Sequence, residues 1–135
     1  MALINWSESY SVKVSKFDNQ HKELVNLINN MNSAMSSGKG KDVLEPTLKK
    51  LVDYTVKHFT DEEQEMKRTN YPGFVSHKYE HDKLTKTAKD LYDKVKNGQT
   101  VLSMDVISFL KDWLTEHIVK VDKKYADHLV AKGVR

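Results

Sequence analysis

Apolar residues recur every three or four positions along four stretches of the chain, a spacing typical of amphipathic helices. The stretches cover roughly residues 18–37, 42–69, 74–97 and 103–131, and glycine or a Pro-Gly pair lies near most of their ends. Four helices with short connections predict an all-α protein folded as an up-down-up-down four-helix bundle. Residues 1–17 lack this period and are expected to form a non-helical N-terminal arm. Together these segments predict one domain spanning residues 1–135.

Each apolar stripe also contains side chains that can bind a metal ion. His77 and His81, in H77-K-Y-E-H81, are four residues apart, a little over one turn at about 100° per residue. Both imidazoles therefore leave the helix on the same side, and His58 and Glu62 have the same spacing. Every predicted helix has at least one such group on the face that should be buried: His21, His58, Glu62, His77, His81 and His117. Asp122 lies just beyond the stripe of the fourth helix.

A lone histidine on an apolar stripe is usually a core residue, but joint burial of five imidazoles with a carboxylate is costly unless a metal ion compensates it. The set therefore predicts a metal centre. Asp122 follows His117 by five residues, which is about 140° off the same direction. It can reach a shared site through a different rotamer or through a local π-type distortion. His128, on a lysine-rich final turn, is expected at the surface.

Composition restricts the alternatives. The chain is 39% hydrophobic and 30% charged, and its net charge of +3 is spread among interleaved acidic and basic residues. This pattern gives little support for a nucleic-acid partner. Cysteine is absent, which excludes thiolate metal sites and cysteine nucleophiles. The start of the sequence lacks the features of a signal peptide, and no stretch is long and apolar enough to insert into a membrane. A cytoplasmic protein is expected.

The motifs as a set resemble the hemerythrin family, in particular its single-domain bacterial members. The resemblance covers nearly the full chain and is carried by W6-S-E-S-Y-S-V-K-V, F17-D-N-Q-H21, H58-F-T-D-E62, H77-K-Y-E-H81 and H117-I-V-K-V-D122. It implies a cofactor of two iron ions in an oxo- or hydroxo-bridged di-iron centre. By resemblance, one ion is held by His77, His81 and His117, and the other by His21 and His58. The resemblance also implies that two carboxylates, Glu62 and Asp122, bridge the ions.

If both ions are octahedral, five imidazoles, two bridging carboxylates and a bridging oxygen leave one position open, on the ion with two histidines. Imidazole and carboxylate ligands suit ferrous and ferric iron. The residues beside the predicted ligands are mainly apolar and are expected to form a dioxygen pocket that excludes water and protons. These residues are Leu24, Phe59, Trp113, Leu114, Ile118 and Val119.

The resemblance implies reversible dioxygen binding at a non-heme di-iron centre, for oxygen transport or storage. We therefore expect a monomer that is not an enzyme, with dioxygen as its partner and an oxygen-consuming enzyme as a recipient. One alternative is a di-iron oxidase, peroxidase or nitric oxide-handling enzyme, although such di-iron enzymes present more carboxylates. A second is an oxygen or iron sensor, for whose signalling domain 135 residues leave no room. A third is a structural metal or nucleic-acid-binding bundle.

Overall fold

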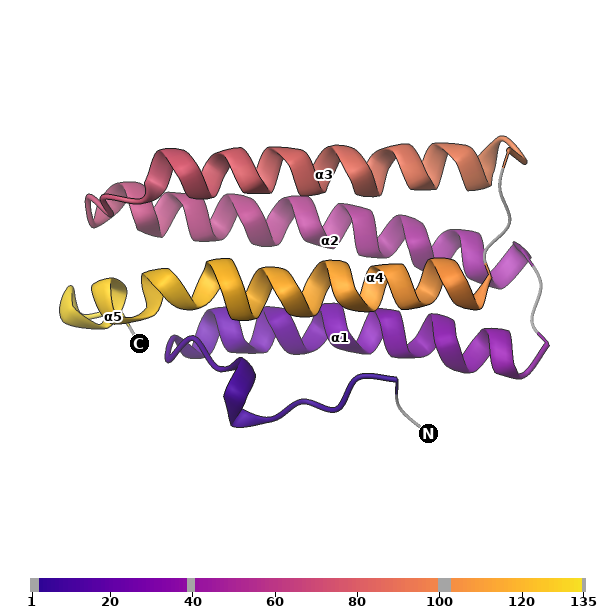
Figure 1. The fold of residues 1–135 in the computed structure, drawn as a ribbon, viewed down its shortest axis with the longest axis horizontal. Coiled ribbons are helices and arrows are strands. Elements are labelled where there is room, and N and C mark those ends of the chain that lie inside the picture. Colours follow the sequence, from indigo (N-terminus) through magenta and orange to yellow (C-terminus); the bar gives the residue numbers. More distant parts are fainter. Residues whose placement is uncertain (1–2, 39–40, 100–102, 135) are drawn as a thin grey trace.

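Four long segments of helix lie side by side in the computed structural model, which describes residues 3–38, 41–99 and 103–134. The helices are α1 (Ser15–Ser36), α2 (Lys41–Arg68), α3 (Phe74–Lys96), α4 (Met104–His117) and α5 (Lys123–Ala131). Figure 1 shows that α1, α2, α3 and α4 alternate in direction, and α1 packs against both α2 and α4. No strand occurs in the described residues. The predicted all-α, up-down-up-down bundle is confirmed.

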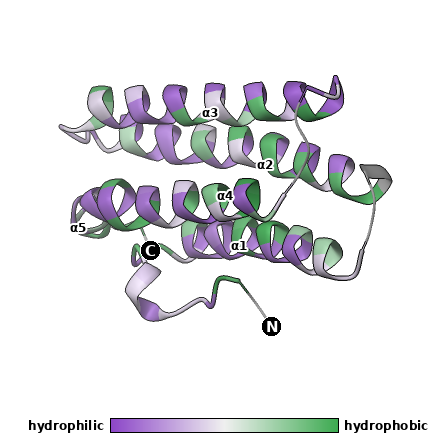
Figure 2. Cartoon of the chain, turned by 45° about the vertical axis from the view of Figure 1, so that its right-hand side comes forward, coloured by the Kyte–Doolittle hydropathy of each residue, from purple (hydrophilic) through white to green (hydrophobic). Residues whose placement is uncertain are grey.

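Apolar side chains fill the bundle in two separate clusters. Hydrophobic and hydrophilic residues alternate along every long helix (Figure 2), as expected for helices with one buried face. The larger cluster includes Leu24, Leu51 and Leu114, and the smaller one includes Phe17 and Tyr125. Along each helix that contributes to both clusters, the polar residues predicted for the metal centre lie between them. The polar centre is therefore enclosed by an apolar layer on either side.

The N-terminal arm differs from the expectation, because α1 begins at Ser15 and a 3-10 turn spans Glu8–Tyr10. The carboxylate of Asp18, in the first turn of α1, holds the end of the arm. It accepts hydrogen bonds from the Val12 backbone N–H at 2.8 Å and from the Ser11 hydroxyl at 2.7 Å. These bonds fix the end of the arm against the helix, which begins three residues sooner than predicted.

The fourth predicted helix is divided by a π-helical turn, η2, over Ile118–Asp122, between α4 and α5. Such turns add a residue to the helical cycle and rotate the residues that follow. The described residues contain no helix that is both long enough and apolar enough to cross a bilayer.

Candidate metal centre

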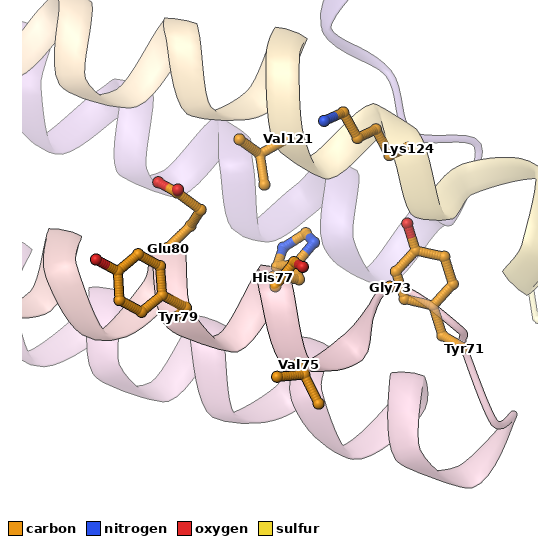
Figure 3. A pocket seen from close by; sticks show the side chains of 9 residues that line it. Tyr71, Gly73, Val75, His77, Tyr79, Glu80, Val121 and Lys124 are labelled. Atoms are coloured by element: carbon orange, nitrogen blue, oxygen red, sulfur yellow. The ribbon is translucent and has the colours of Figure 1, made fainter.

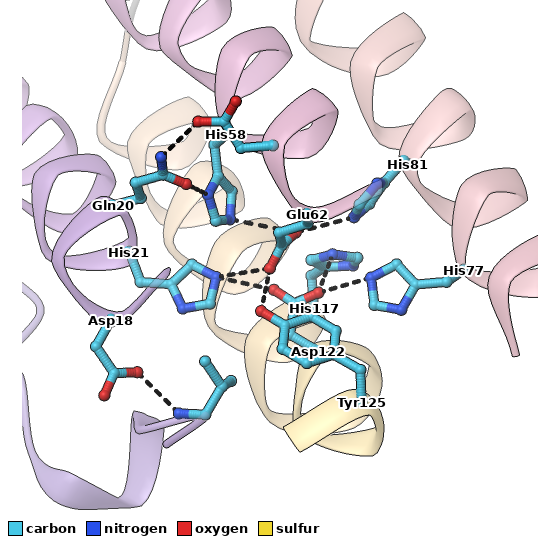
Figure 4. Close-up of polar contacts among 12 residues, drawn as sticks. Asp18, Gln20, His21, His58, Glu62, His77, His81, His117, Asp122 and Tyr125 are labelled. Atoms are coloured by element: carbon cyan, nitrogen blue, oxygen red, sulfur yellow. Dashed lines mark hydrogen bonds and ion pairs between the residues drawn. The ribbon is translucent and has the colours of Figure 1, made fainter. Parts of the chain in front are cut away.

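All seven residues of the predicted metal centre are buried, and they converge from every long helix of the bundle (Figure 4). Two groups of potential ligand atoms form, each with all its atoms within 4.8 Å of one another. One group contains three histidines and the other contains two, and both include Glu62 and Asp122. The three-histidine group has His77, His81 and His117; the two-histidine group has His21 and His58.

The two carboxylates lie between these groups of histidines. Asp122 Oδ1 is 2.9 Å from His77 Nε2 and 2.8 Å from His117 Nε2, whereas Asp122 Oδ2 is 3.0 Å from His21 Nε2. Its two oxygens therefore face opposite groups. Glu62 Oε1 lies 3.3 Å from His58 Nε2 and 3.2 Å from His81 Nε2, and so it also contacts both groups. This is the arrangement that a pair of metal ions with shared carboxylates requires.

The π-helical turn places Asp122 at the centre. In a regular helix, Asp122 would point about 140° away from His117. With η2 intervening, both side chains face the interior, and their closest atoms are 2.8 Å apart. Of the two routes considered from the sequence, the structure uses the backbone distortion, as π-helical turns at functional sites often do.

The residues fit a metal ion because many of their polar atoms have no other partner. Most of the buried side-chain nitrogen and oxygen atoms that lack a hydrogen bond, among the described residues, belong to this centre. They include Nε2 of His21, His58 and His81, together with Glu62 Oε1 and Asp122 Oδ2. Buried polar atoms are normally paired, and an unpaired one costs about 1–3 kcal/mol. A cation would satisfy these atoms together.

The electrostatics of the protein alone show how strongly the centre attracts positive charge. Burial acts to lower the pKa of His21, but the close contacts and negative charges of Asp122 and Glu62 raise it to about 9. The pKa of His81 is also raised to about 9, against burial, by Glu62 and Glu63. Burial lowers the pKa of His58 to about 4. Without a metal ion, His21 and His81 therefore hold protons beside the carboxylates, in the place that a metal ion would occupy.

Three polar residues support the centre from outside and were not identified from the sequence. Gln20 contacts His58 Nδ1, Glu63 contacts His81 Nδ1, and the Tyr125 hydroxyl donates to Glu62 Oε2 (Figure 4 shows Gln20 and Tyr125). Their positions relative to the motifs give a weak signal, since Gln20 and Glu63 adjoin ligand candidates and Tyr125 follows Asp122 by three residues. Burial of Tyr125, with the charges of Glu62 and Asp122, raises the pKa of its hydroxyl.

Two of the six residues predicted for the dioxygen pocket do not line it in the structure. A narrow space beside His21 and His58, too small to hold a water molecule, is lined by four of the predicted residues and by Leu84, which the sequence did not suggest: Leu24, Phe59, Trp113, Leu114 and Leu84. This space is referred to as the cavity. The prediction that Val119 lines the pocket is wrong, because its side chain is 46% exposed. Val119 lies within the π-helical turn that brings Asp122 inward. Ile118 is buried in the larger apolar cluster and does not line this cavity.

The other side of the centre lies nearer the surface. A surface pocket of about 660 Å³ is lined by His77 together with Tyr71, Tyr79 and Lys124 (Figure 3).

The prediction that His128 lies at the surface is wrong, because its side chain is half-buried. Its Nε2–H donates to the Thr69 carbonyl at 2.9 Å. It belongs to neither group of candidate ligands.

Comparison with known proteins agrees with this geometry. The sequence model described as Hemerythrin HHE cation binding domain matches residues 12–129. The chain belongs to the hemerythrin family. It is 37% identical over 132 residues to the Bacteriohemerythrin of Methylococcus capsulatus, covering 97% of this chain and 100% of that one. It is 30% identical over 124 residues to the Myohemerythrin of Sipunculus nudus, covering 92% of each.

Solved structures show the same fold. A crystal structure of wild-type hemerythrin superposes with a TM-score of 0.87 at 36% identity, covering 95% of this chain and 98% of that one. A crystal structure of a hemerythrin variant with one leucine replaced by tyrosine gives 0.88 at the same identity, with 96% and 98% covered. The cofactor of this family is a di-iron centre, and the buried cluster of histidine and carboxylate groups is able to hold it.

Proposed function

We propose that the chain is an oxygen carrier or store, in which the seven buried residues hold two iron ions that bind dioxygen reversibly. The observation that carries the proposal is the sharing of Glu62 and Asp122 between a three-histidine group and a two-histidine group. Two bridged metal ions account for this arrangement, and the smaller histidine group leaves more coordination positions for an external ligand. When bound, the iron pair supplies the electrons that a dioxygen molecule takes up on binding.

The protein's own residues would keep that chemistry reversible. Beyond the ligand candidates, the described residues that line the cavity at the two-histidine group are apolar. Leu24 is fully buried, and Phe59 stacks on His81 with ring centroids 3.8 Å apart. An apolar lining excludes the water and protons that would promote irreversible oxidation. The lining thus favours a carrier over an oxidase or peroxidase, which must deliver protons to reduced oxygen.

Metal analysis of ligand variants tests the assignment of the site. Glu62→Ala and Asp122→Ala should each lower the iron content well below two ions per chain, because each removes a bridge. Asp127→Ala is the matched control: this carboxylate lies five residues beyond Asp122, but its side chain is 92% exposed and pairs with Lys13 at 3.4 Å. Full loading of both bridge variants would remove these carboxylates from the site.

The expectations of a monomer, a cytoplasmic location and an oxygen-consuming enzyme as recipient belong to the same proposal. They are supported by the sequence analysis alone. Size-exclusion chromatography with light scattering tests the first, and a stable dimer at micromolar concentration would contradict it.

A further inference from the structure

The two groups of histidines are supported by different chemistry on the side away from the centre. His58, in the two-histidine group, has its Nδ1 2.5 Å from the amide oxygen Oε1 of Gln20 (Figure 4). His81, in the three-histidine group, has its Nδ1 2.8 Å from the carboxylate oxygen Oε2 of Glu63. A neutral amide therefore stands behind one imidazole, and an acidic side chain stands behind the other.

The orientation of the Gln20 amide is fixed by its second contact. Gln20 is buried, and its Nε2–H donates to Asp61 Oδ2 at 2.7 Å, while Lys57 Nζ donates to the same oxygen at 3.2 Å. An ionised carboxylate can only accept hydrogen bonds, so the amide nitrogen must face Asp61 and the amide oxygen must face His58. A flipped amide would place two acceptors against each other.

The fixed amide determines where the proton of His58 resides. Because Gln20 Oε1 can only accept, His58 donates from Nδ1 and presents the lone pair of Nε2 on the other side of the ring. Nε2 is buried without a hydrogen bond, and it lies 3.3 Å from Glu62 Oε1, at the centre. Asp61 thus orients Gln20, and Gln20 orients His58 for binding metal through Nε2.

We propose that Gln20 is a positioning residue that keeps His58 a neutral and comparatively weak iron ligand, so that the two iron ions differ in their preference for the ferric state. A carboxylate that accepts a hydrogen bond from a metal-bound imidazole makes that imidazole a more basic ligand, whereas an amide does so much less. The iron held by His81 is stabilised as ferric by Glu63. The iron held by His58, where dioxygen binds, stays ferrous more readily. This inference rests on the proposed function, in which both histidines are iron ligands.

Exchanging the two polar groups tests the inference with the charge held constant. In the double variant Gln20→Glu/Asp61→Asn, the carboxylate moves into contact with His58 and the amide moves outward. The net charge and the hydrogen bonds that join His58, residue 20 and residue 61 are retained, whereas Lys57 loses the oxygen that it shares with Gln20. The midpoint potential of the iron-loaded protein should fall. A tenfold gain in ferric over ferrous preference at that ion corresponds to a fall of about 59 mV. The exchangeable Nδ1–H proton resonance of His58, shifted by the paramagnetic iron, should also move.

Two further variants complete the test. Asn19→Glu adds an acidic group at an exposed position beside Gln20 and should leave potential and resonance unchanged. Glu63→Gln replaces the carboxylate that contacts His81 with an amide and should raise the midpoint potential. If the double variant does not load iron, the potential of Glu63→Gln alone decides between the two outcomes. The inference is overturned if the double variant loads iron and keeps the wild-type potential, or if Glu63→Gln does not raise it. Failure of the proposed function would be seen separately, as wild-type protein that lacks two iron ions or does not oxygenate reversibly.

Discussion

Removal of iron with a chelator should make the stability of the protein fall as the pH rises from about 6.5 to about 9. Without iron, the charges of Glu62 and Asp122 are balanced by protons on His21 and His81. Burial alone would lower the pKa values of both histidines, but contacts with the carboxylates raise each from 6.5 to about 9. A raised folded-state pKa stabilises the protein fully below the unfolded value, and this stabilisation is lost as the pH rises through the folded value.

The expected effect is large compared with the stability of a domain. At about 1.4 kcal/mol per pKa unit, each of the two histidines accounts for about 3 kcal/mol, against a typical total of about 5–15 kcal/mol. His58 acts in the opposite direction, because burial lowers its pKa to about 4 and it resists protonation below pH 6.5. The pKa values of Glu62 and Asp122 lie below the ordinary range, so these groups contribute a constant amount from pH 6.5 to 9. The iron-free protein should therefore be most stable near pH 6.5.

Urea unfolding followed by far-ultraviolet circular dichroism measures this dependence. Unfolding free energies of iron-free protein at several pH values between about 6.5 and about 9 should decline steadily, whereas those of iron-loaded protein should change much less, because iron replaces the protons. His21→Gln should remove about half of the slope. An iron-free protein whose stability is flat over this range would refute the idea that protons occupy the metal's position.

Three substitutions test other parts of the structure. Leu24→Ser should leave the iron content unchanged but speed the loss of the oxygenated form, followed by its visible absorption band, because water gains access to the centre; an unchanged decay would count against the dry pocket. Tyr125→Phe removes the hydroxyl that donates to Glu62 and should cost about 1–3 kcal/mol in urea unfolding; equal stability would show that the contact is unimportant. Asp18→Ala should free the Val12 amide, and faster hydrogen exchange at that amide is the expected sign.

The helical period was sufficient to predict the bundle and the burial of the five histidines and Glu62, because direction on a regular helix follows from spacing alone. The π-helical turn is the exception, because its backbone departs from a regular helix. Spacing left two routes open for Asp122, and it placed Val119 in the pocket, where the structure has it exposed. The rotation that brings Asp122 inward is a property of the backbone over five residues, which a fixed angle per residue does not include.

Contacts between helices set a second limit. Gln20 reaches His58, and Leu84 joins the cavity beside Leu24, through packing of segments far apart in the sequence. Neither follows from the pattern on one helix. His128 shows the same effect. Its lysine-rich turn predicted a surface position, but its imidazole donates a hydrogen bond to the carbonyl of Thr69, just after α2.

The absorption spectrum of reduced, iron-loaded protein tests the central claim most directly. It should be recorded without oxygen, again after admission of air, and a third time after oxygen is removed. The account predicts a ligand-to-metal band that appears with oxygen, disappears on its removal and returns over repeated cycles, in protein that contains close to two iron ions per chain. A spectrum that does not respond to oxygen, or that changes once and does not return, would contradict reversible binding at this centre.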